Sequence, residues 1–307
     1  MEPYLFVYNL LSIKGIGRVK ANKILGSFQN ELNRKDIDIN VLQNKLLNYL
    51  SKAQVDEVIS KKATNDNINS TNTIKNVKFI TIYNDDYPSE LRKSLKSNAP
   101  TILSYIGNLN LLDYPRVGFC GSRKASDKGL NTAEDIATQL AEMKLVNISG
   151  YASGIDQKVH YSSLKNGGST IIVLPEGINR FRIKKSVKDV WNWDKVLVLS
   201  EFFPNHIWTS NRAMQRNATI IGLSDAMVLI EAGERGGSID AGYKTLKMKK
   251  NLFAPIYQGM PKEAIGNQIL LNKGAIKLMK SKTTGRANLN KLFKLIEDKD
   301  NNDQLSL

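Results

Sequence analysis

Strand-like and helix-like hydrophobic patterns alternate along the chain from Arg116 onward. Short apolar runs typical of buried strands recur at residues 117–120, 145–149, 169–174, 196–199, 226–231 and 252–255. Segments with apolar residues at helical spacing separate these runs. Because strands that alternate with helices pair in parallel, the pattern predicts an α/β fold with a doubly wound, mostly parallel sheet.

The pattern before residue 116 predicts a different organisation. Residues 1 to about 70 have apolar positions at helical spacing, for example Leu42, Leu46 and Leu50, and two further strands are predicted at 77–83 and 101–107. The polar stretch 64–73 lacks periodicity and predicts a linker. We therefore predict three parts, which are a small helical domain at 1–70, the α/β domain at 71–280, and a polar C-terminal tail with a short helix at 281–307.

The composition adds a charge argument. The 307 residues include 44 Lys and Arg against 29 Asp and Glu, which gives a formal net charge of +15. Such an excess attracts polyanions, so nucleic acid is the leading partner class, with an acidic membrane surface second and a charge that serves only solubility as the alternative. Cys120 is the single cysteine, which excludes an intrachain disulfide and a cysteine-rich zinc site. Its position in an apolar run predicts an inert, buried thiol.

The chain shows neither a basic leader with a cleavage site nor an apolar run of membrane-spanning length. We expect a reduced, cytoplasmic protein without membrane insertion.

The stretch Val117–Gly129 predicts a phosphate site. Its apolar start runs into a tight turn, and a helical pattern follows from Asn131. The turn consists of Gly121, Ser122, Arg123 and Lys124. Free backbone N–H groups and the helix dipole favour an anion at a helix start, and an arginine donates to two phosphate oxygens at once. An ordinary turn between strand and helix with a surface arginine is the alternative.

Similar turns follow other predicted strands. Gly150, Ser153 and Gly154 follow the run at 145–149, and Gly237 and Ser238 follow the run at 226–231. In a doubly wound sheet, ligands bind beyond the carboxyl ends of the strands, so several such turns can share one site.

Asp156 and His160 lie four residues apart after the Gly150–Gly154 turn and are close to Lys158. On one helix face they would suit a metal or acid–base site. No third ligand is evident, however, and an aspartate at a helix start is more often a cap.

Cations and aromatic residues interleave after the run at 196–199, where Phe202, Phe203 and Trp208 precede Arg212, Arg216 and Asn217. This mixture suits a single strand, because bases stack on rings while arginines meet phosphates. Alternatively the aromatic residues are core, which we expect of at least one of them. The basic run at 182–188 either follows a nucleic-acid backbone or forms a solvated helix face.

The segment Leu10–Leu25 looks like a helix-hairpin-helix motif. Its turn, Gly15-Ile16-Gly17, has free amides that can hold one nucleic-acid phosphate, and Arg18 and Lys20 add charge. Many such hairpins only pack helices together, so both interpretations stay open.

Taken in order, these segments resemble the DNA-processing protein family called DprA or Smf. The resemblance extends from about Tyr87 to Lys277 and includes Gly121-Ser122-Arg123, the Ser149–Asp156 segment and Arg216-Asn217. It implies an extended Rossmann-like fold and single-stranded DNA binding without catalysis. It also implies loading of a RecA-type recombinase onto DNA taken up in natural transformation, often by a homodimer.

The resemblance implies an anion pocket from the turn residues, with Arg216 and Asn217 on its rim. The predicted nucleic-acid-binding residues are Gly121, Ser122, Arg123, Lys124, Gly150, Ser153, Gly154, Lys158, Arg212, Arg216, Asn217, Gly237 and Ser238, together with Gly15, Gly17 and Lys20 of the hairpin. We predict no catalytic residue, no metal ligand and no cofactor.

The chain departs from the family pattern in places. Arg-Asn-Arg is here Arg216-Asn217-Ala218, which removes one cation, and Ser-Gly-Ser is here Gly236-Gly237-Ser238. Service in a defence system or a mobile element is therefore an alternative to transformation. A sensor of nucleotide ligands or a nucleotide-processing enzyme of the same fold is the alternative function, although the proline-glycine-glycine turn with a following glutamate that related hydrolases use is missing.

Overall fold

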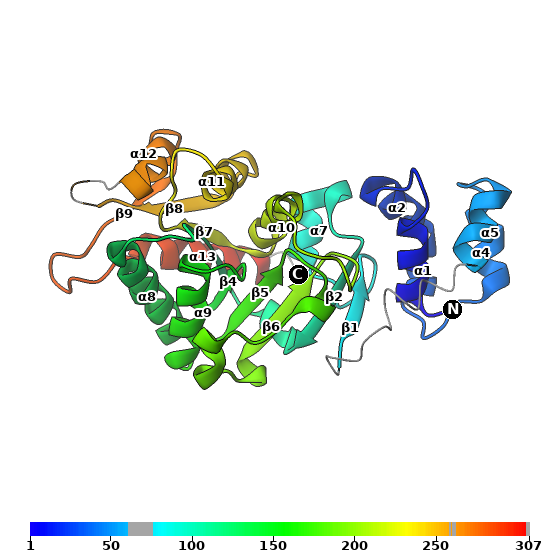
Figure 1. The fold of residues 1–307 in the computed structure, drawn as a ribbon, viewed down its shortest axis with the longest axis horizontal. Helices are drawn as coiled ribbons and strands as arrows, with labels where there is room; N and C mark the ends of the chain where they lie inside the picture. Colours follow the sequence, from blue (N-terminus) through cyan, green and yellow to red (C-terminus); the bar gives the residue numbers. More distant parts are fainter. Residues whose placement is uncertain (61–75, 258, 260–261, 305–307) are drawn as a thin grey trace. The chain divides into compact units, whose positions relative to one another are not determined.

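The computed structural model describes residues 1–60, 76–257, 259 and 262–304 (Figure 1). Nine strands form one sheet in the order β1-β2-β6-β5-β4-β3-β7-β8-β9. The strands are β1 (Lys78–Thr81), β2 (Ile102–Gly107), β3 (Arg116–Cys120), β4 (Val146–Ser149), β5 (Thr170–Leu174), β6 (Val196–Ser200), β7 (Ala226–Leu229), β8 (Asn251–Pro255) and β9 (Ile276–Leu278). β1 and β2 pair antiparallel, while β3 pairs in parallel with both β4 and β7. The predicted fold class is confirmed.

Helices connect the strands. They are α1 (Pro3–Leu11), α2 (Arg18–Leu25), α3 (Gln29–Leu32), α4 (Ile39–Leu46), α5 (Lys52–Ser60), α7 (Ser89–Leu95), α8 (Asp127–Glu142), α9 (Ile155–Lys165), α10 (Ser210–Leu223), α11 (Gly237–Lys247), α12 (Ile265–Asn272) and α13 (Asn290–Gln304). Short 3-10 turns lie at residues 26–28, 96–98, 109–113, 178–180, 185–190, 193–195 and 262–264. Among the described residues, no helix is both long enough and apolar enough to cross a bilayer.

The eight predicted strands are all present, with ends that coincide or differ by one or two residues. The predicted strand at 77–83 stops at Thr81 because the chain turns there, and the Asn84 backbone N–H donates to the Thr81 carbonyl at 2.9 Å. The pattern missed β9, which has only three residues and one buried side chain, Leu278. A run that short and that exposed has no hydrophobic alternation to detect.

The chain divides into two compact units. The first comprises Met1–Ile106, Leu174–Phe181 and Leu199–Arg212, and the second comprises Gly107–Val173, Arg182–Val198 and Ala213–Leu307. The predicted linker at 64–73 lies outside the described residues. The domain boundaries drawn from sequence stay predictions.

The first unit joins the N-terminal helices to β1 and β2. The ring of Tyr8 on α1 contacts the Phe79 ring of β1 edge-on, with the centroids 5.9 Å apart. The Asn9 side-chain amide donates to the Val58 carbonyl at 2.9 Å and ties α1 to α5. Buried aromatic and polar contacts of this kind fix α1 against both the sheet and its neighbouring helix.

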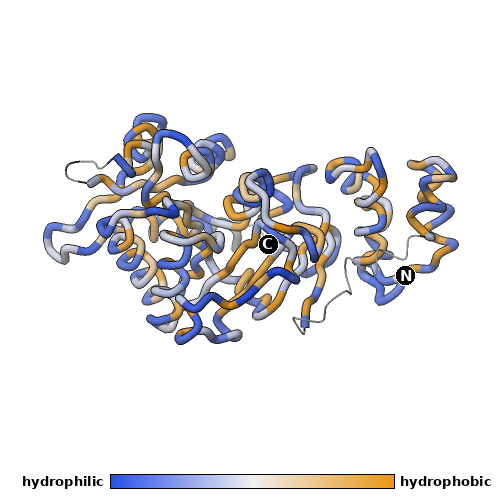
Figure 2. The backbone as a smooth tube through the Cα atoms, in the orientation of Figure 1, coloured by the Kyte–Doolittle hydropathy of each residue, from blue (hydrophilic) through white to orange (hydrophobic). Residues whose placement is uncertain are grey.

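The second unit has helices on both faces of its strands. α8 and α9 pack together on one face, and α11 and α12 pack on the other (Figure 1). The core on the α8 face includes Phe119, Ile136 and Val228, and Leu292 of α13 is part of the same cluster. Hydrophobic segments accordingly concentrate along the strands, while polar residues recur on the outer turns of the helices (Figure 2). This arrangement places the carboxyl ends of several parallel strands at one edge.

Candidate functional site

The loops after β3, β4 and β7 lie at one edge of the sheet. β3 pairs in parallel with β4 on one side and with β7 on the other, so the three carboxyl ends are adjacent. From β3 the chain runs to β4 and then β5, whereas from β7 it runs to β8 in the opposite direction. In doubly wound folds the ligand crevice lies at such a reversal.

Hydrogen bonds join the turn after β3 to the starts of two helices. The Ser238 hydroxyl, in the first turn of α11, donates to the Gly121 carbonyl at 2.8 Å. The Ile155 backbone N–H, at the first residue of α9, donates to the Ser122 carbonyl at 3.2 Å. The predicted site residues Gly121, Ser122, Gly154 and Ser238 are thus brought together.

The turns after β3 and β4 are packed so closely that two of their glycines are required. A Cβ on Gly121 would lie 2.5 Å from Cγ1 of Ile155, and a Cβ on Gly154 would lie 2.4 Å from the Ser122 carbonyl oxygen. Gly154 also has a φ of +77°, which side chains other than glycine adopt at a cost. These two glycines allow the turn after β3 to pack directly against the turn after β4.

The start of α11 is open by comparison. A Cβ on Gly237 would meet only the Met214 sulfur among the described atoms, at 3.5 Å, which is an ordinary contact distance. Gly237 is exposed, and Asn217 donates to its carbonyl at 3.4 Å. Space therefore remains beside the N-terminal amides of α11.

Arg216 lies beneath the Gly150–Gly154 turn instead of on the rim where the sequence placed it. It is 6% exposed, and its Nη1 donates to the Val173 carbonyl at 3.1 Å. A Cβ on Gly150 would lie 1.9 Å from the same Nη1 and 2.5 Å from Oδ2 of Asp156. Only glycine at 150 leaves room for the guanidinium.

Asp156 and His160 hold the turn after β4 in shape. The Asp156 carboxylate accepts from the Ser149 hydroxyl at 2.8 Å and from the Ala152 N–H at 3.1 Å. His160 lies 2.6 Å from the Gly150 carbonyl through Nε2 and 2.7 Å from the Thr170 hydroxyl through Nδ1. Within the described residues, three or more His, Cys, Asp or Glu side chains nowhere gather as a metal site would require.

Burial lowers the pKa of His160 to about 4, so its ring is neutral at physiological pH. A carbonyl oxygen only accepts, so Nε2 carries the hydrogen and donates to Gly150. Nδ1 lies beside the Thr170 hydroxyl, which also lies 3.0 Å from the Asn147 carbonyl. Desolvation also raises the pKa of the Cys120 thiol to about 12, which agrees with the inert thiol predicted from its position, although the residue is half-buried instead of fully buried.

The start of α8 corrects the prediction made for Val117–Gly129. α8 begins at Asp127 instead of Asn131, because the Ser126 hydroxyl caps it by accepting from the Gly129 N–H at 3.1 Å. The fully buried Glu231 carboxylate accepts from the Ser126 N–H at 2.8 Å and from its hydroxyl at 2.5 Å. The positive end of α8 is therefore already neutralised by the protein's own anion.

The predicted cations of the second unit differ in exposure and pairing. Arg123 and Lys124 are exposed at the turn after β3, and Ser153 is exposed in the turn after β4. Lys158 lies 2.6 Å from a carboxylate oxygen of Glu134. Arg123 and Lys124 are thus the exposed positive charges at the joined turns.

The remaining predicted residues belong to the first unit. Arg212 donates to the Ile207 carbonyl at 2.8 Å and stacks over the ring of Phe202, which is buried as expected of one aromatic residue in that segment. Trp208 is 47% exposed.

The hairpin residues form the predicted turn between α1 and α2. Gly15 has a φ of +84°, Gly17 precedes the first residue of α2, and Lys20 is exposed. Arg18 Nη2 lies 3.2 Å from a carboxylate oxygen of Glu201, whose side chain is fully buried. This pairing neutralises the positive charge that the sequence assigned to Arg18.

A family model described as DNA recombination-mediator protein A matches residues 78–287. The chain belongs to this family. The resemblance to DprA and Smf proteins seen in the sequence is confirmed. The match contains every predicted site residue of the second unit, whereas Gly15, Gly17 and Lys20 lie outside it.

Curated relatives carry the names DprA and Smf. The DNA processing protein DprA of Streptococcus pneumoniae is 36% identical over 175 residues, which are 56% of this chain and 61% of that protein. DprA of Bacillus subtilis is 28% identical over 57% of this chain and 59% of its own length, and Smf of Escherichia coli is 29% identical over 62% and 51%. The chain thus spans between about half and three fifths of the length of these relatives.

Solved family structures share the fold. The X-ray structure of S. pneumoniae DprA superposes with a TM-score of 0.72 at 26% identity, over 90% of this chain and 95% of that chain. A DprA from Helicobacter pylori, described for its single-stranded DNA binding mode, superposes with a TM-score of 0.58 at 23% identity, over 73% and 97%.

Glu231 makes the contact at this edge that the sequence pattern did not reveal. It follows β7, 105 residues after Ser126, the cap residue that donates to it. A single acidic residue after an apolar run carries no signal of its partner. Only the parallel pairing of β3 with β7 brings the two together.

Proposed function

We propose that the chain binds single-stranded DNA at the carboxyl edge of the second unit, where the turn after β3 meets the starts of α9 and α11. One observation carries this proposal. The Gly121–Arg123 turn is hydrogen-bonded to both helix starts, and the exposed start of α11 leaves space next to the exposed Arg123 and Lys124. Backbone amides at helix starts and neighbouring cations together favour a phosphate.

Backbone N–H groups donate to phosphate oxygens and do not distinguish between bases. The binding is therefore expected to tolerate many DNA sequences. An unpaired strand bends more readily into adjacent turns than a duplex does. Each cation that meets a phosphate contributes to the salt dependence of the affinity. The formal net charge of +15 supports the same partner class.

We further propose that the protein protects single-stranded DNA and passes it to a RecA-type recombinase, in DNA uptake or recombination, as a homodimer and without catalysis. Family membership and the similarity to DprA proteins support this role. The side chains of Asp156 and His160 are engaged with the turn that they hold, which supports a binding role for this site over proton transfer.

A matched pair of variants at Gly237 tests the DNA site. An aspartate at the first turn of α11 complements the helix dipole and preserves the fold, but it repels a phosphate, whereas asparagine has nearly the same shape without the charge. We expect Gly237→Asp to lower the affinity for a short single strand by about tenfold or more relative to Gly237→Asn, measured by fluorescence anisotropy. Equal affinities in the two variants would contradict the site.

A salt series tests the cations. Arg123→Ala is expected to reduce the slope of log affinity against log salt by about one, while Lys247→Ala removes the same charge at the far end of α11 and leaves the slope unchanged.

Parallel titrations with duplex DNA test the preference for single strands. A mononucleotide that bound tightly while oligonucleotides did not would favour the alternative, a nucleotide sensor. Stimulation of recombinase assembly on DNA by the wild type, and its loss in Gly237→Asp, tests the mediator role.

A further inference from the structure

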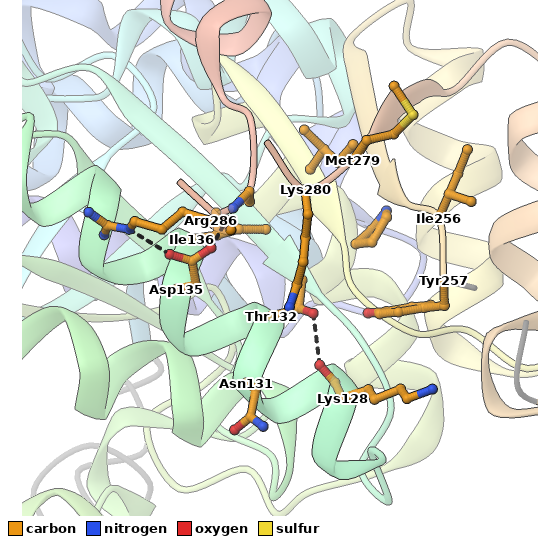
Figure 3. Close-up of a pocket in the computed structure, with 14 residues that line it drawn as sticks. Lys128, Asn131, Thr132, Asp135, Ile136, Ile256, Tyr257, Met279, Lys280 and Arg286 are labelled. Carbon is orange, nitrogen blue, oxygen red and sulfur yellow. Dashed lines mark hydrogen bonds and ion pairs between the residues drawn. The ribbon is translucent and has the colours of Figure 1, made fainter. Parts of the chain in front are cut away.

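A second pocket, of about 390 Å³, opens at the carboxyl ends of β8 and β9 (Figure 3). Ile256 and Tyr257 follow β8, and Met279 and Lys280 follow β9. The first turns of α8 and the segment 285–287 complete the lining. Small-molecule sites typically have volumes from about 300 Å³ upward. None of the residues that form the joined turns after β3 and β4 lines this pocket.

The lining is largely apolar. Ile136 and Leu278 are buried at its base, whereas Ile256 is 37% exposed and Met279 is 59% exposed. Exposed aliphatic side chains gathered around a hollow indicate a ligand that covers them. The ring of Tyr257 adds a flat face among them (Figure 3).

Two cations line the same pocket. Within the described part of the chain, neither Lys128 nor Lys280 has a hydrogen bond or ion pair to its ammonium group. Arg286 differs, because it lies 2.9 Å from the Asp135 carboxylate and 3.1 Å from that of Glu142. The ammonium groups of Lys128 and Lys280 are therefore available to bind an anion in the pocket.

The walls are fixed without a ligand. The Asp135 carboxylate accepts from Arg286 Nε and, at 2.6 Å, from the Ala287 N–H, so the segment after β9 is bound to α8. The Tyr257 hydroxyl donates to the Ile230 carbonyl at 3.1 Å, and burial raises its pKa. A ring and a loop held in place in this way lose little conformational freedom when a ligand enters.

We infer that this pocket binds a nucleoside monophosphate group. A flat heterocycle matches the Tyr257 ring and the aliphatic side chains, and the exposed amide of Asn131 offers a donor and an acceptor to the edge of a base. The phosphate matches Lys128 and Lys280. The group is either a free nucleotide or one unit of a strand. The inference goes beyond the proposed strand site and stands without it.

Calorimetry with AMP tests the inference, with adenosine and inorganic phosphate as half-ligands. We expect AMP to bind at least about tenfold more tightly than either half, because it engages both the apolar lining and the lysines. The Asn131→Trp variant fills the pocket from an exposed position on α8, and a Lys128→Ala/Lys280→Ala double variant removes both charges. Each is expected to lower AMP affinity about tenfold or more, while Lys247→Ala, at another exposed lysine, leaves it unchanged.

Several results would overturn the inference. They are an absence of AMP binding to the wild type, AMP affinity no higher than that of phosphate, or AMP affinity unchanged in Asn131→Trp. AMP binding that is lost in Arg123→Ala but retained in Asn131→Trp would place the nucleotide at the sheet-edge turns instead. The oligonucleotide titrations of Arg123→Ala and Gly237→Asp test the strand site separately, so the two proposals fail independently.

The source of the nucleotide follows from one further titration. If Asn131→Trp also weakens binding of a short single strand, the pocket receives one unit of that strand. If the affinity for the strand is unchanged while AMP binding is lost, the pocket serves a free nucleotide. Thermal unfolding of both variants provides the folding control, because all three substituted positions are exposed.

Discussion

The starts of α8 and α11 follow adjacent parallel strands, yet they meet anions in opposite ways. α8 follows β3, and its N-cap residue Ser126 donates to the buried carboxylate of Glu231. α11 follows β7 and begins at an exposed Gly237, where a Cβ would make an ordinary contact with the Met214 sulfur. The start of α8 is thus occupied by the protein's own carboxylate, whereas the start of α11 is exposed and is the one proposed to receive a phosphate.

The difference teaches that a glycine-rich turn before a helix does not by itself define an anion site. Both stretches contain glycine, serine and a cation, so their sequences favour phosphate equally. A side chain from a neighbouring strand decides which helix start stays open. Contacts between distant segments thus select the site that local sequence only suggests.

The largest expected effect comes from removing the internal anion. Glu231→Gln replaces one accepting oxygen with a donor that faces the Ser126 donors, so we expect the free energy of unfolding to fall by about 3 kcal/mol. Urea unfolding measures the change, and Glu234→Gln, at an exposed position in the same loop, is the control. A Glu231→Gln protein as stable as the control would show that α8 does not depend on this carboxylate.

The pH dependence of stability probes the turn that His160 supports. The folded pKa of about 4 lies below the ordinary 6.5, so the unfolded chain takes up the proton first as the pH falls. The contribution of His160 is therefore complete above about pH 6.5 and is lost between 6.5 and 4, with a maximum of about 3 kcal/mol. Unfolding of the wild type and of His160→Gln at several pH values isolates this contribution. Parallel curves for the two proteins would refute it.

The smallest expected effects on stability come from alanine substitutions at Gly154, which is closely packed, and at Gly237, which is exposed. Gly154→Ala forces a left-handed φ on alanine and a Cβ against the Ser122 carbonyl, and we expect a loss of about 2 kcal/mol. Among the described atoms Gly237→Ala meets only an ordinary contact with the Met214 sulfur, so stability should change by less than about 0.5 kcal/mol. Thermal unfolding of both variants measures the difference, and similar losses would remove the distinction between the two turns.

The sequence predicted the fold well because buried parallel strands leave unbroken apolar runs such as Ile171–Leu174. It also selected the turns that meet at the sheet edge, since glycine and hydroxyl residues after a strand are local features. It did not place Arg216 under Gly150 or Glu231 against Ser126, because both contacts join segments that are far apart in the chain. The pocket between α8 and β9 was missed for the same reason, as its lining comes from four separate segments.

The packing of α13 bears on how this protein can be shortened. Leu289, Leu292 and Ile296 are buried in the same cluster as Ile136 and Leu140 of α8, in the region that the sequence predicts to be a polar tail with a short helix. Truncation after Lys280 would expose the apolar face of α8 to solvent and favour aggregation. Fusion tags and cleavage sites therefore belong beyond Gln304.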